Sequence, residues 1–207
     1  MIDYTRCFWL QIVKGIGRTS GAFPSLPSGM DAILKKHFDI FMERGELPPE
    51  LKSLKEYKLF DDKELLKIWR SNFKGLEFVD KKSGILLHGA IDNILVKGKK
   101  LVVLDYKTRG FPLKDDTHEH YILQMNLYNF LLRKNGYDTE DYSYLLFYHP
   151  KEVVETGEVI LNTDLIKVKT SAKEGERIFQ EAIKLINSEE PECSENCEYC
   201  KWGENDK

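Results

Sequence analysis

Two short apolar segments joined by a turn form the clearest hydrophobic pattern in the chain. Residues 85–96 and 101–107 are rich in Ile, Leu and Val, and a lysine-rich segment, 97–100, joins them. Gly98, at the first central position of that segment, suits a two-residue type II′ turn. We therefore predict two β-strands that form a hairpin, with Lys97 paired with Lys100.

This register places two aspartates opposite each other. Counting back along both strands from Lys97 and Lys100 pairs Asp92 with Asp105. Facing Cβ atoms of an antiparallel pair are roughly 4.5–5.5 Å apart, where like charges repel. Such a pair needs a cation between the carboxylates or a raised pKa on one of them. Hard divalent ions such as Mg²⁺ and Mn²⁺ suit these oxygen ligands.

Lys107 adds an ammonium group to the two carboxylates. It lies two residues after Asp105 and therefore shares its face of the strand. A metal ion held by two carboxylates polarises a phosphodiester and lowers the pKa of a bound water, and a nearby lysine orients that water or stabilises the developing negative charge. The alternative, an exposed charged strand end, fits less well because the strands are otherwise apolar.

A helix is predicted over residues 118–134, followed by the helix stop Asn135-Gly136. Gln124 and Tyr128 are four residues apart on it and share one face. Apart from any site, they would belong to an amphipathic helix with one buried tyrosine. The apolar positions of this helix are Tyr121, Leu123, Met125, Leu127, Tyr128, Leu131 and Leu132.

An earlier helix is predicted after a Gly/Ser/Pro-rich linker at residues 15–27. Ser28 and Asp31 have the spacing of a capping box, with Asp in place of Glu. His37 lies on the apolar stripe that follows, so it is either a hydrogen-bonded core residue or a metal ligand, a role that histidine often has. The apolar stripe consists of Met30, Ile33, Leu34, Phe38, Phe41 and Met42.

Four cysteines lie near the two ends of the chain: Cys7 alone, and then Cys193, Cys197 and Cys200 as C-x₃-C-x₂-C. Residues 1–10 are too polar for an export signal, so we expect a reducing, cytoplasmic location with thiols that are free or bind metal. Four thiolates hold an iron-sulfur cluster or a structural Zn²⁺. The lone distant Cys7 favours iron-sulfur over a paired zinc knuckle, and such a site would staple the chain ends together.

The composition agrees with one soluble enzyme domain. The 207 residues are 42% hydrophobic and 31% charged, which is ordinary for a globular protein. The net charge of −3, from 31 basic and 34 acidic residues, does not by itself indicate nucleic-acid binding. Basic residues are instead concentrated near the N-terminus, at the hairpin turn and beside Asp105, where they could track a phosphate backbone. No apolar segment has the length of a membrane span.

The candidate residues occur in a specific order: Asp92, then Asp105-Tyr106-Lys107, then Gln124-x-x-x-Tyr128. That order and spacing resemble the PD-(D/E)XK nuclease superfamily, and within it the RecB-like branch. One cysteine before this set and three after it resemble the iron-sulfur nucleases of the CRISPR-associated and AddB type. Each motif alone is weak, but the ordered set is specific.

This resemblance implies an α/β fold with a PD-(D/E)XK (restriction-endonuclease-like) core, in which helices flank a central mixed sheet and a cysteine cluster joins the termini. It implies a single nuclease domain over residues 1–207, with the core at about 28–150. Lys107 would serve the attacking water, and Gln124 and Tyr128 would shape the site or hold DNA. The implied ligands of Mg²⁺ or Mn²⁺ are His37, Asp92, Asp105 and Tyr106, with Asp31 as the alternative to His37. The implied ligands of a 4Fe-4S cluster, with Zn²⁺ as the alternative metal, are Cys7, Cys193, Cys197 and Cys200.

The function that the resemblance implies is metal-dependent hydrolysis of DNA phosphodiester bonds. Single strands or ends are the favoured substrates, and exonuclease activity is favoured over endonuclease activity. A module that keeps the nuclease fold but only binds DNA or a protein partner is a second hypothesis, because no unambiguous glutamate stands on the first helix. A zinc-stapled structural module is a third. DNA is the expected partner, no membrane is expected, and protein partners stay open.

Overall fold

The computed structural model describes residues 4–17, 25–194 and 197. They belong to two units, a larger one, Pro24–Glu176, and a smaller one formed by Met1–Phe23 and Arg177–Lys207. Within the described residues, no helix is long and apolar enough to cross a membrane.

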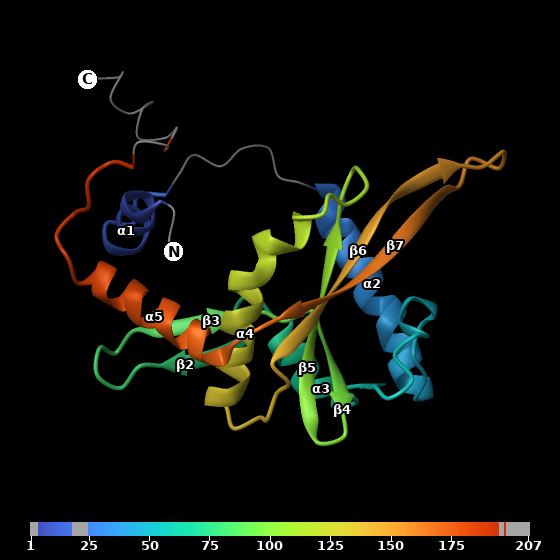
Figure 1. Ribbon diagram of the computed structural model, residues 1–207, viewed down its shortest axis with the longest axis horizontal. Helices are drawn as coiled ribbons and strands as arrows, with labels where there is room; N and C mark the ends of the chain where they lie inside the picture. The colour runs from blue at the N-terminus through green and yellow to red at the C-terminus, as the bar shows by residue number, and fades with distance from the viewer. Residues whose placement is uncertain (1–3, 18–24, 195–196, 198–207) are drawn as a thin grey trace. The chain divides into compact units, whose positions relative to one another are not determined.

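A five-stranded mixed sheet forms the centre of the larger unit (Figure 1). Its strand order is β1-β4-β5-β6-β7, in which β5 and β6 run parallel and the other neighbours run antiparallel. The fold is therefore the predicted α/β architecture with helices around a central mixed sheet. The strand bounds are β1 Lys58–Leu59, β4 Asn93–Lys97, β5 Lys100–Thr108, β6 Tyr142–Val153 and β7 Val159–Lys169.

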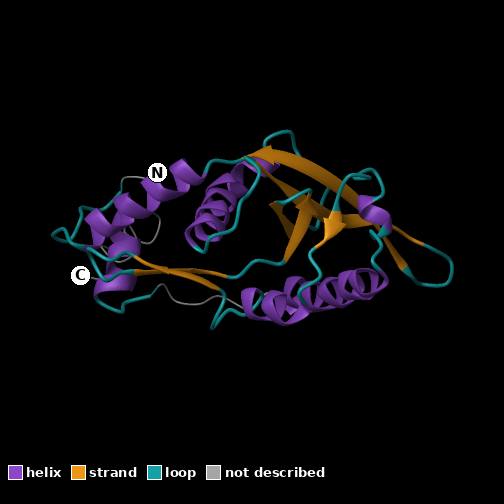
Figure 2. Ribbon diagram, turned by 90° about the horizontal axis from the view of Figure 1, so that it is seen from below, coloured by secondary structure: helices purple, strands orange, loops and turns teal. Residues whose placement is uncertain are grey.

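Two helices cover the two faces of this sheet. Helix α2 (Ser25–Arg44) packs on the face that carries Leu104 and Tyr106. Helix α4 (Ile122–Lys134) packs on the other face, which carries Val103. This division follows from the alternation of side chains along β5, and Figure 2 shows the long helix α2 lying along one side of the strands. The shorter helical segments of the larger unit are η1 Pro49–Leu51, α3 Lys63–Trp69 and η2 Thr117–Tyr121.

The hairpin of β4 and β5 has the predicted register. Lys97 pairs with Lys100, and Asn93 pairs with Leu104. Gly98 has a φ of 59°, and no other residue type in the described ranges has a positive φ. A type I′ turn would need a positive φ at both central residues, so the predicted type II′ turn is the one that fits.

The prediction of one continuous strand over residues 85–96 is wrong. The segment is divided into β4 and a separate strand, β3 (Leu86–Gly89), which pairs with β2 (Leu76–Val79) in a two-stranded sheet. A Cβ atom at Gly89 would lie 3.0 Å from side chains of helix α4, so the main chain of β3 packs directly against that helix. The chain then bends at Asp92 before it enters β4.

Helix α2 begins before the predicted capping box, so that prediction is also wrong. Ser25 is already helical, and Ser28 lies inside the helix rather than at its N-cap. Pro27 is tolerated there because the main-chain N–H groups of a first helical turn have no partners within the helix. Ile33 was assigned to the buried stripe but is 62% exposed. The buried members of the stripe are Leu34, Phe38 and Met42.

The smaller unit contains helix α1 (Thr5–Val13), and helix α5 (Ala172–Ile186) begins in the larger unit and ends in the smaller one. The Arg6 guanidinium donates a hydrogen bond of 2.7 Å to the Glu190 carboxylate and one of 3.0 Å to the Cys193 sulfur. These contacts join residues from near the start of the chain to residues beyond α5.

Candidate active site

Asp92 and Asp105 lie together at the end of the hairpin away from its turn. Asp92 precedes β4 by one residue, and its Oδ2 atom accepts a hydrogen bond of 3.0 Å from the main-chain N–H of Tyr106. Asp105 lies within β5 and is 2% exposed. The two carboxylates meet as predicted, although a bend rather than a strand pair brings Asp92 to this position.

Burial raises the pKa of Asp105 to about 7, and the neighbouring negative charge of Asp92 contributes to the same shift. Lys107 and Lys35 act in the opposite direction. The buried Oδ2 atom of Asp105 forms an ion pair with the Lys107 ammonium. A buried carboxylate with a raised pKa beside a second carboxylate suits a divalent cation with oxygen ligands.

Lys107 and Gln124 link the carboxylates to helix α4. The Lys107 ammonium, ion-paired with Asp105, donates a hydrogen bond of 3.2 Å to Oε1 of Gln124. It also lies 4.7 Å from the centre of the Tyr121 ring, a cation–π contact. Nε2 of Gln124 donates a hydrogen bond of 2.8 Å to the Tyr128 hydroxyl. The amide of Gln124 therefore has a defined orientation, with its oxygen toward the lysine and its nitrogen toward the tyrosine.

Tyr128 contributes a protonated hydroxyl to the same cluster. Burial, followed by the negative charge of Asp105, raises the pKa of Tyr128. Because its oxygen accepts the hydrogen bond from Gln124, its own O–H remains able to donate to an oxygen of a bound ligand.

Helix α2 presents Asp31 and Lys35 to the carboxylates, and the sequence analysis missed Lys35. The Lys35 ammonium lies 2.8 Å from Oδ2 of Asp31 and 3.2 Å from Oδ1 of Asp92. Burial lowers the pKa of Lys35, but Asp92 and Asp31 outweigh this effect and leave the pKa raised. The i,i+4 spacing of Asp31 and Lys35 on a predicted helix was the available signal.

His37 occupies a different place on the same helix. Its Nε2 atom lies 3.1 Å from Oε1 and 3.2 Å from Oε2 of Glu50. At about 100° per residue, His37 projects roughly 200° away from Lys35 around the helix. The geometry therefore gives His37 no support as a ligand beside Asp92 and favours Asp31, the alternative.

The side chain of Tyr106 points to the opposite face from Asp105. Its hydroxyl accepts a hydrogen bond of 2.6 Å from Nδ2 of Asn93, and its ring centre lies 4.6 Å from that of Phe38 on α2. Any metal ligand that Tyr106 supplies beside Asp105 must therefore be its main-chain carbonyl.

Arg70, which follows α3, is a further residue that sequence reasoning missed. Its Nε atom donates a hydrogen bond of 2.7 Å to the main-chain carbonyl of Asp92, and its Nη1 atom donates one of 2.7 Å to Oδ1 of Asp39 on α2. Arg70 thus holds the bend at Asp92 against helix α2. No spacing pattern marks it, because the contact joins segments 22 residues apart.

Two of the predicted cysteine ligands lie side by side. The sulfurs of Cys7 and Cys197 are 3.5 Å apart, so the first cysteine meets the C-terminal segment as predicted. Two sulfurs bound to one tetrahedral Zn²⁺ at about 2.3 Å lie roughly 3.8 Å apart. Cys193 instead accepts a hydrogen bond from Arg6, and Cys200 lies outside the described residues. Within the described ranges, no three His, Cys, Asp or Glu side chains gather closely enough to hold one metal ion.

Comparison with known proteins agrees with this fold. Residues 29–204 match the family described as the PD-(D/E)XK nuclease superfamily. The chain therefore belongs to this superfamily, which makes it a nuclease by class and nucleic acid its class of substrate.

Individual relatives add little to the family match. No curated protein matches the chain. A solved structure described as "Crystal structure of SSO0001" is 13% identical, with a TM-score of 0.38. That match covers 96% of this chain and 91% of the other.

Proposed function

We propose that this protein is a metal-dependent nuclease that hydrolyses phosphodiester bonds of DNA, acting on single strands or ends and as an exonuclease rather than an endonuclease. The observation that carries the proposal is the carboxylate pair, Asp92 and Asp105, with Lys107 and Gln124 beside it. Superfamily membership supports nuclease activity, and the preference for DNA and its ends goes beyond that membership.

The carboxylate pair would hold Mg²⁺ or Mn²⁺, with the main-chain carbonyl of Tyr106 as a further ligand. Asp31, which pairs with Lys35 and does not form a three-carboxylate group with the pair in this structure, would join them when the ion binds. Such an ion supplies Lewis-acid polarisation of the phosphodiester and a lowered pKa for the attacking water. Ligation requires an ionised Asp105, and protons compete for that carboxylate below about pH 7 because burial and Asp92 raise its pKa.

Lys107 would orient the attacking water and stabilise the charge that develops on the phosphate. Its ammonium is held between Asp105 and Oε1 of Gln124, so two fixed acceptors direct its remaining N–H donor. A preorganised donor of this kind acts on the transition state without reorganising during the reaction. Tyr128 would donate to an oxygen of the bound strand.

A nuclease assay on end-labelled single- and double-stranded DNA tests this proposal. We expect cleavage with Mg²⁺ or Mn²⁺, none with EDTA, and resistance of a circular single strand, which has no ends. Cleavage of the circle would contradict the exonuclease assignment alone. Wild-type turnover by an Asp105→Asn protein would contradict the active site.

We also propose that Cys7, Cys193, Cys197 and Cys200 hold a 4Fe-4S cluster, or alternatively Zn²⁺, that staples the chain ends. The 3.5 Å approach of the Cys7 and Cys197 sulfurs supports one shared site. Visible absorbance of anaerobically purified protein distinguishes iron-sulfur from zinc. Cys7→Ser and Cys197→Ser should lose the same bound metal. Unchanged metal content in Cys7→Ser would contradict a single site formed by both ends of the chain.

The contact of Lys35 with Asp92 favours a second candidate function, a module that binds nucleic acid without cleaving it. An ammonium 3.2 Å from the Asp92 carboxylate already compensates part of the negative charge that would attract a metal ion. Calorimetric titration with Mn²⁺ separates the two candidates, because a binding module of this kind needs no metal at the carboxylate pair.

A further inference from the structure

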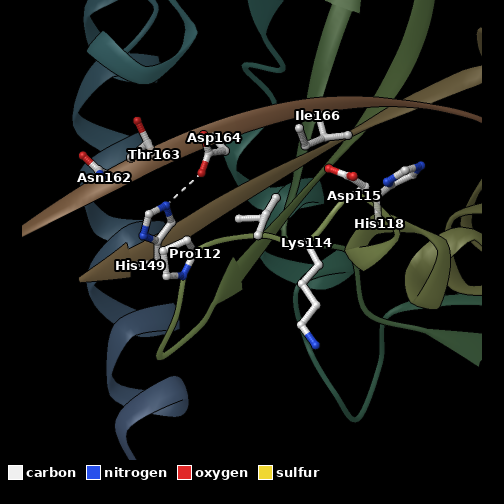
Figure 3. A pocket seen from close by; sticks show the side chains of 10 residues that line it. Pro112, Lys114, Asp115, His118, His149, Asn162, Thr163, Asp164 and Ile166 are labelled. Carbon is white, nitrogen blue, oxygen red and sulfur yellow. Dashed lines mark hydrogen bonds and ion pairs between the residues drawn. The ribbon is translucent and has the colours of Figure 1, made fainter. Parts of the chain in front are cut away.

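A polar cavity lies in the larger unit, between the loop that follows β5 and the strands β6 and β7 (Figure 3). Its volume is about 680 Å³, within the range of roughly 300–1,000 Å³ that small-molecule and cofactor sites occupy. The carboxylate pair, Lys107 and Gln124 do not line this cavity. The cavity and these residues all belong to the larger unit.

The register of the sheet shows how the cavity relates to the catalytic residues. Lys107 on β5 pairs with Phe147 on β6, and Phe147 pairs with Asp164 on β7. Paired residues project from the same face of a sheet, so Asp164, which lines the cavity, shares the face of Lys107. Two strand spacings separate them by about 10 Å. That span corresponds to about three nucleotides at the roughly 3.4 Å rise of a nucleic-acid strand.

One wall of the cavity is an ordered polar pair. His149 is 5% exposed, and its Nε2 atom lies 2.9 Å from Oδ2 of Asp164. Figure 3 shows this contact as a dashed line. Asn162 lies near Asp164 on β7, and Asp115 and His118 lie on the other side of the cavity. The Asp164 side chain is 45% exposed, so the carboxylate is fixed by the histidine and still accessible from the cavity.

The charges of the cavity suit a base better than a phosphate. Two carboxylates, Asp115 and Asp164, line it and would repel a phosphate group. Carboxylate and amide side chains are instead the groups that read base edges, since Asp accepts from the amino group of cytosine and Asn pairs with adenine. Lys114 also lines the cavity, but it is exposed and its side chain extends away from the His149–Asp164 pair (Figure 3).

We infer that this cavity binds a nucleobase of the DNA strand that the carboxylate pair holds, within about three nucleotides of the bond that is cleaved. Asp164 and the amide oxygen of Asn162 accept hydrogen bonds from an exocyclic amino group. Cytosine, adenine and guanine carry such a group, whereas thymine and uracil lack it and offer a single N–H donor, at N3, between two carbonyl oxygens that a carboxylate repels. This inference rests on the proposed function, because it assumes that a DNA strand lies across the sheet.

Binding of two matched oligonucleotides tests the inference. Fluorescence anisotropy would compare labelled oligo(dC) and oligo(dU) of equal length, since cytosine and uracil have the same size and differ in the 4-amino group and in the proton on N3. Ca²⁺, another hard cation with oxygen ligands, would replace Mg²⁺, and electrophoresis would confirm intact oligonucleotide. We expect oligo(dC) to bind about tenfold more tightly, in line with roughly 1–3 kcal/mol for a good base-edge contact. Equal affinity, or no binding of either oligonucleotide, would overturn the inference.

Variants assign the preference to the cavity. Asn162→Ala, at an exposed position, and Asp164→Asn should each bring the oligo(dC) to oligo(dU) ratio close to one. Glu155→Gln is the control, because it removes one carboxylate at the exposed end of the same strand pair, outside the cavity. A preference retained in both cavity variants would place the base elsewhere. Equal tightening of both oligonucleotides by Asp164→Asn would show that the cavity holds phosphate and would also overturn the inference.

The two proposals fail in distinguishable ways. If the protein prefers oligo(dC) but cleaves nothing with Mg²⁺ or Mn²⁺, the result supports the base site and contradicts the nuclease assignment. If the protein cleaves DNA but binds both oligonucleotides equally, the result supports the nuclease assignment and contradicts the base site.

Discussion

Two polar clusters adjoin helix α2, and their charges are compensated to different degrees. In the Glu50 cluster (His37, Glu50 and Tyr148), the carboxylate lies 3.1 Å from Nε2 of His37 and accepts a hydrogen bond of 3.0 Å from the Tyr148 hydroxyl. Both of its oxygens have partners. In the carboxylate pair, two acids share one site, and the pKa of Asp105 stays raised although Lys107 forms an ion pair with it.

This difference separates a stabilising cluster from a reactive one. A cluster whose polar atoms are hydrogen-bonded holds its surroundings in one arrangement, whereas two carboxylates that share one site repel each other unless a cation lies between them. Strongly shifted pKa values therefore mark candidate functional sites. The raised pKa of Asp105 marks the carboxylate pair in this way, while Glu50 ties η1 to β6 and α2.

Removing one charge of the carboxylate pair should have the largest effect. We expect Asp105→Asn to lower the cleavage rate by about a thousandfold or more, because it removes a metal ligand at the reacting phosphate. The protein should stay folded, since the amide relieves repulsion with Asp92. Gel-based cleavage rates and thermal melts measure both effects, with Asp61→Asn at an exposed site as the control. A rate within a few fold of wild type would place catalysis elsewhere.

Removing the lysine beside the pair should have the next largest effect. Lys107→Ala should lower the cleavage rate by about a hundredfold, and Mn²⁺ affinity should be unchanged or higher because a competing cation is lost. Cleavage rates and Mn²⁺ calorimetry test this, with Lys99→Ala at the hairpin turn as the matched control. Loss of Mn²⁺ binding in Lys107→Ala would show that the lysine supports the site structurally.

The two clusters should respond differently to substitutions on α2. Asp31→Asn should weaken Mn²⁺ binding by about tenfold, with little change in melting temperature. His37→Ala should leave the Mn²⁺ titration unchanged and lower the stability by about 1 kcal/mol, through loss of the contact with Glu50. The opposite result, with weaker Mn²⁺ binding in His37→Ala alone, would restore His37 as the ligand.

The smallest predicted effect concerns pH and stability without metal. Asp105 has an ordinary pKa of 3.8 when unfolded and a pKa of about 7 when folded. Between these values the folded protein binds more protons than the unfolded chain, so its stability falls as pH rises and becomes constant above about pH 7. Asp105→Asn lacks this pH-dependent contribution to stability. Its melting temperature in EDTA, relative to that of wild type, should therefore rise from pH 4 to pH 8. A difference that does not vary with pH would contradict the raised pKa.

The hairpin shows which parts of the site could be predicted from the sequence. The distance from Gly98 to Asp105 is set by a local turn and by strand alternation, and the observed register agrees with the count. The position of Gln124 and Tyr128 on one helix face was equally local. These features depend on residues close together in the chain.

The parts that failed depend on tertiary packing. The bend at Asp92 follows the packing of the Gly89 main chain against helix α4, and no local pattern reports that contact. The direction of His37 depends on how α2 is turned about its axis, which an apolar stripe defines only approximately. Arg70 was missed because its partners come from two distant segments.

The alternation of side chains along β5 also limits how the chain can change in length. One residue inserted between Leu101 and Asp105 would exchange the two faces of the strand, so that Tyr106 would face α4 and the carboxylate would enter the apolar core beneath α2. The connection between β6 and β7, at residues 154–158, carries no such constraint because it lies beyond the paired strands. Homologous chains should therefore differ in length at that connection and keep a constant number of residues from the hairpin turn to Asp105.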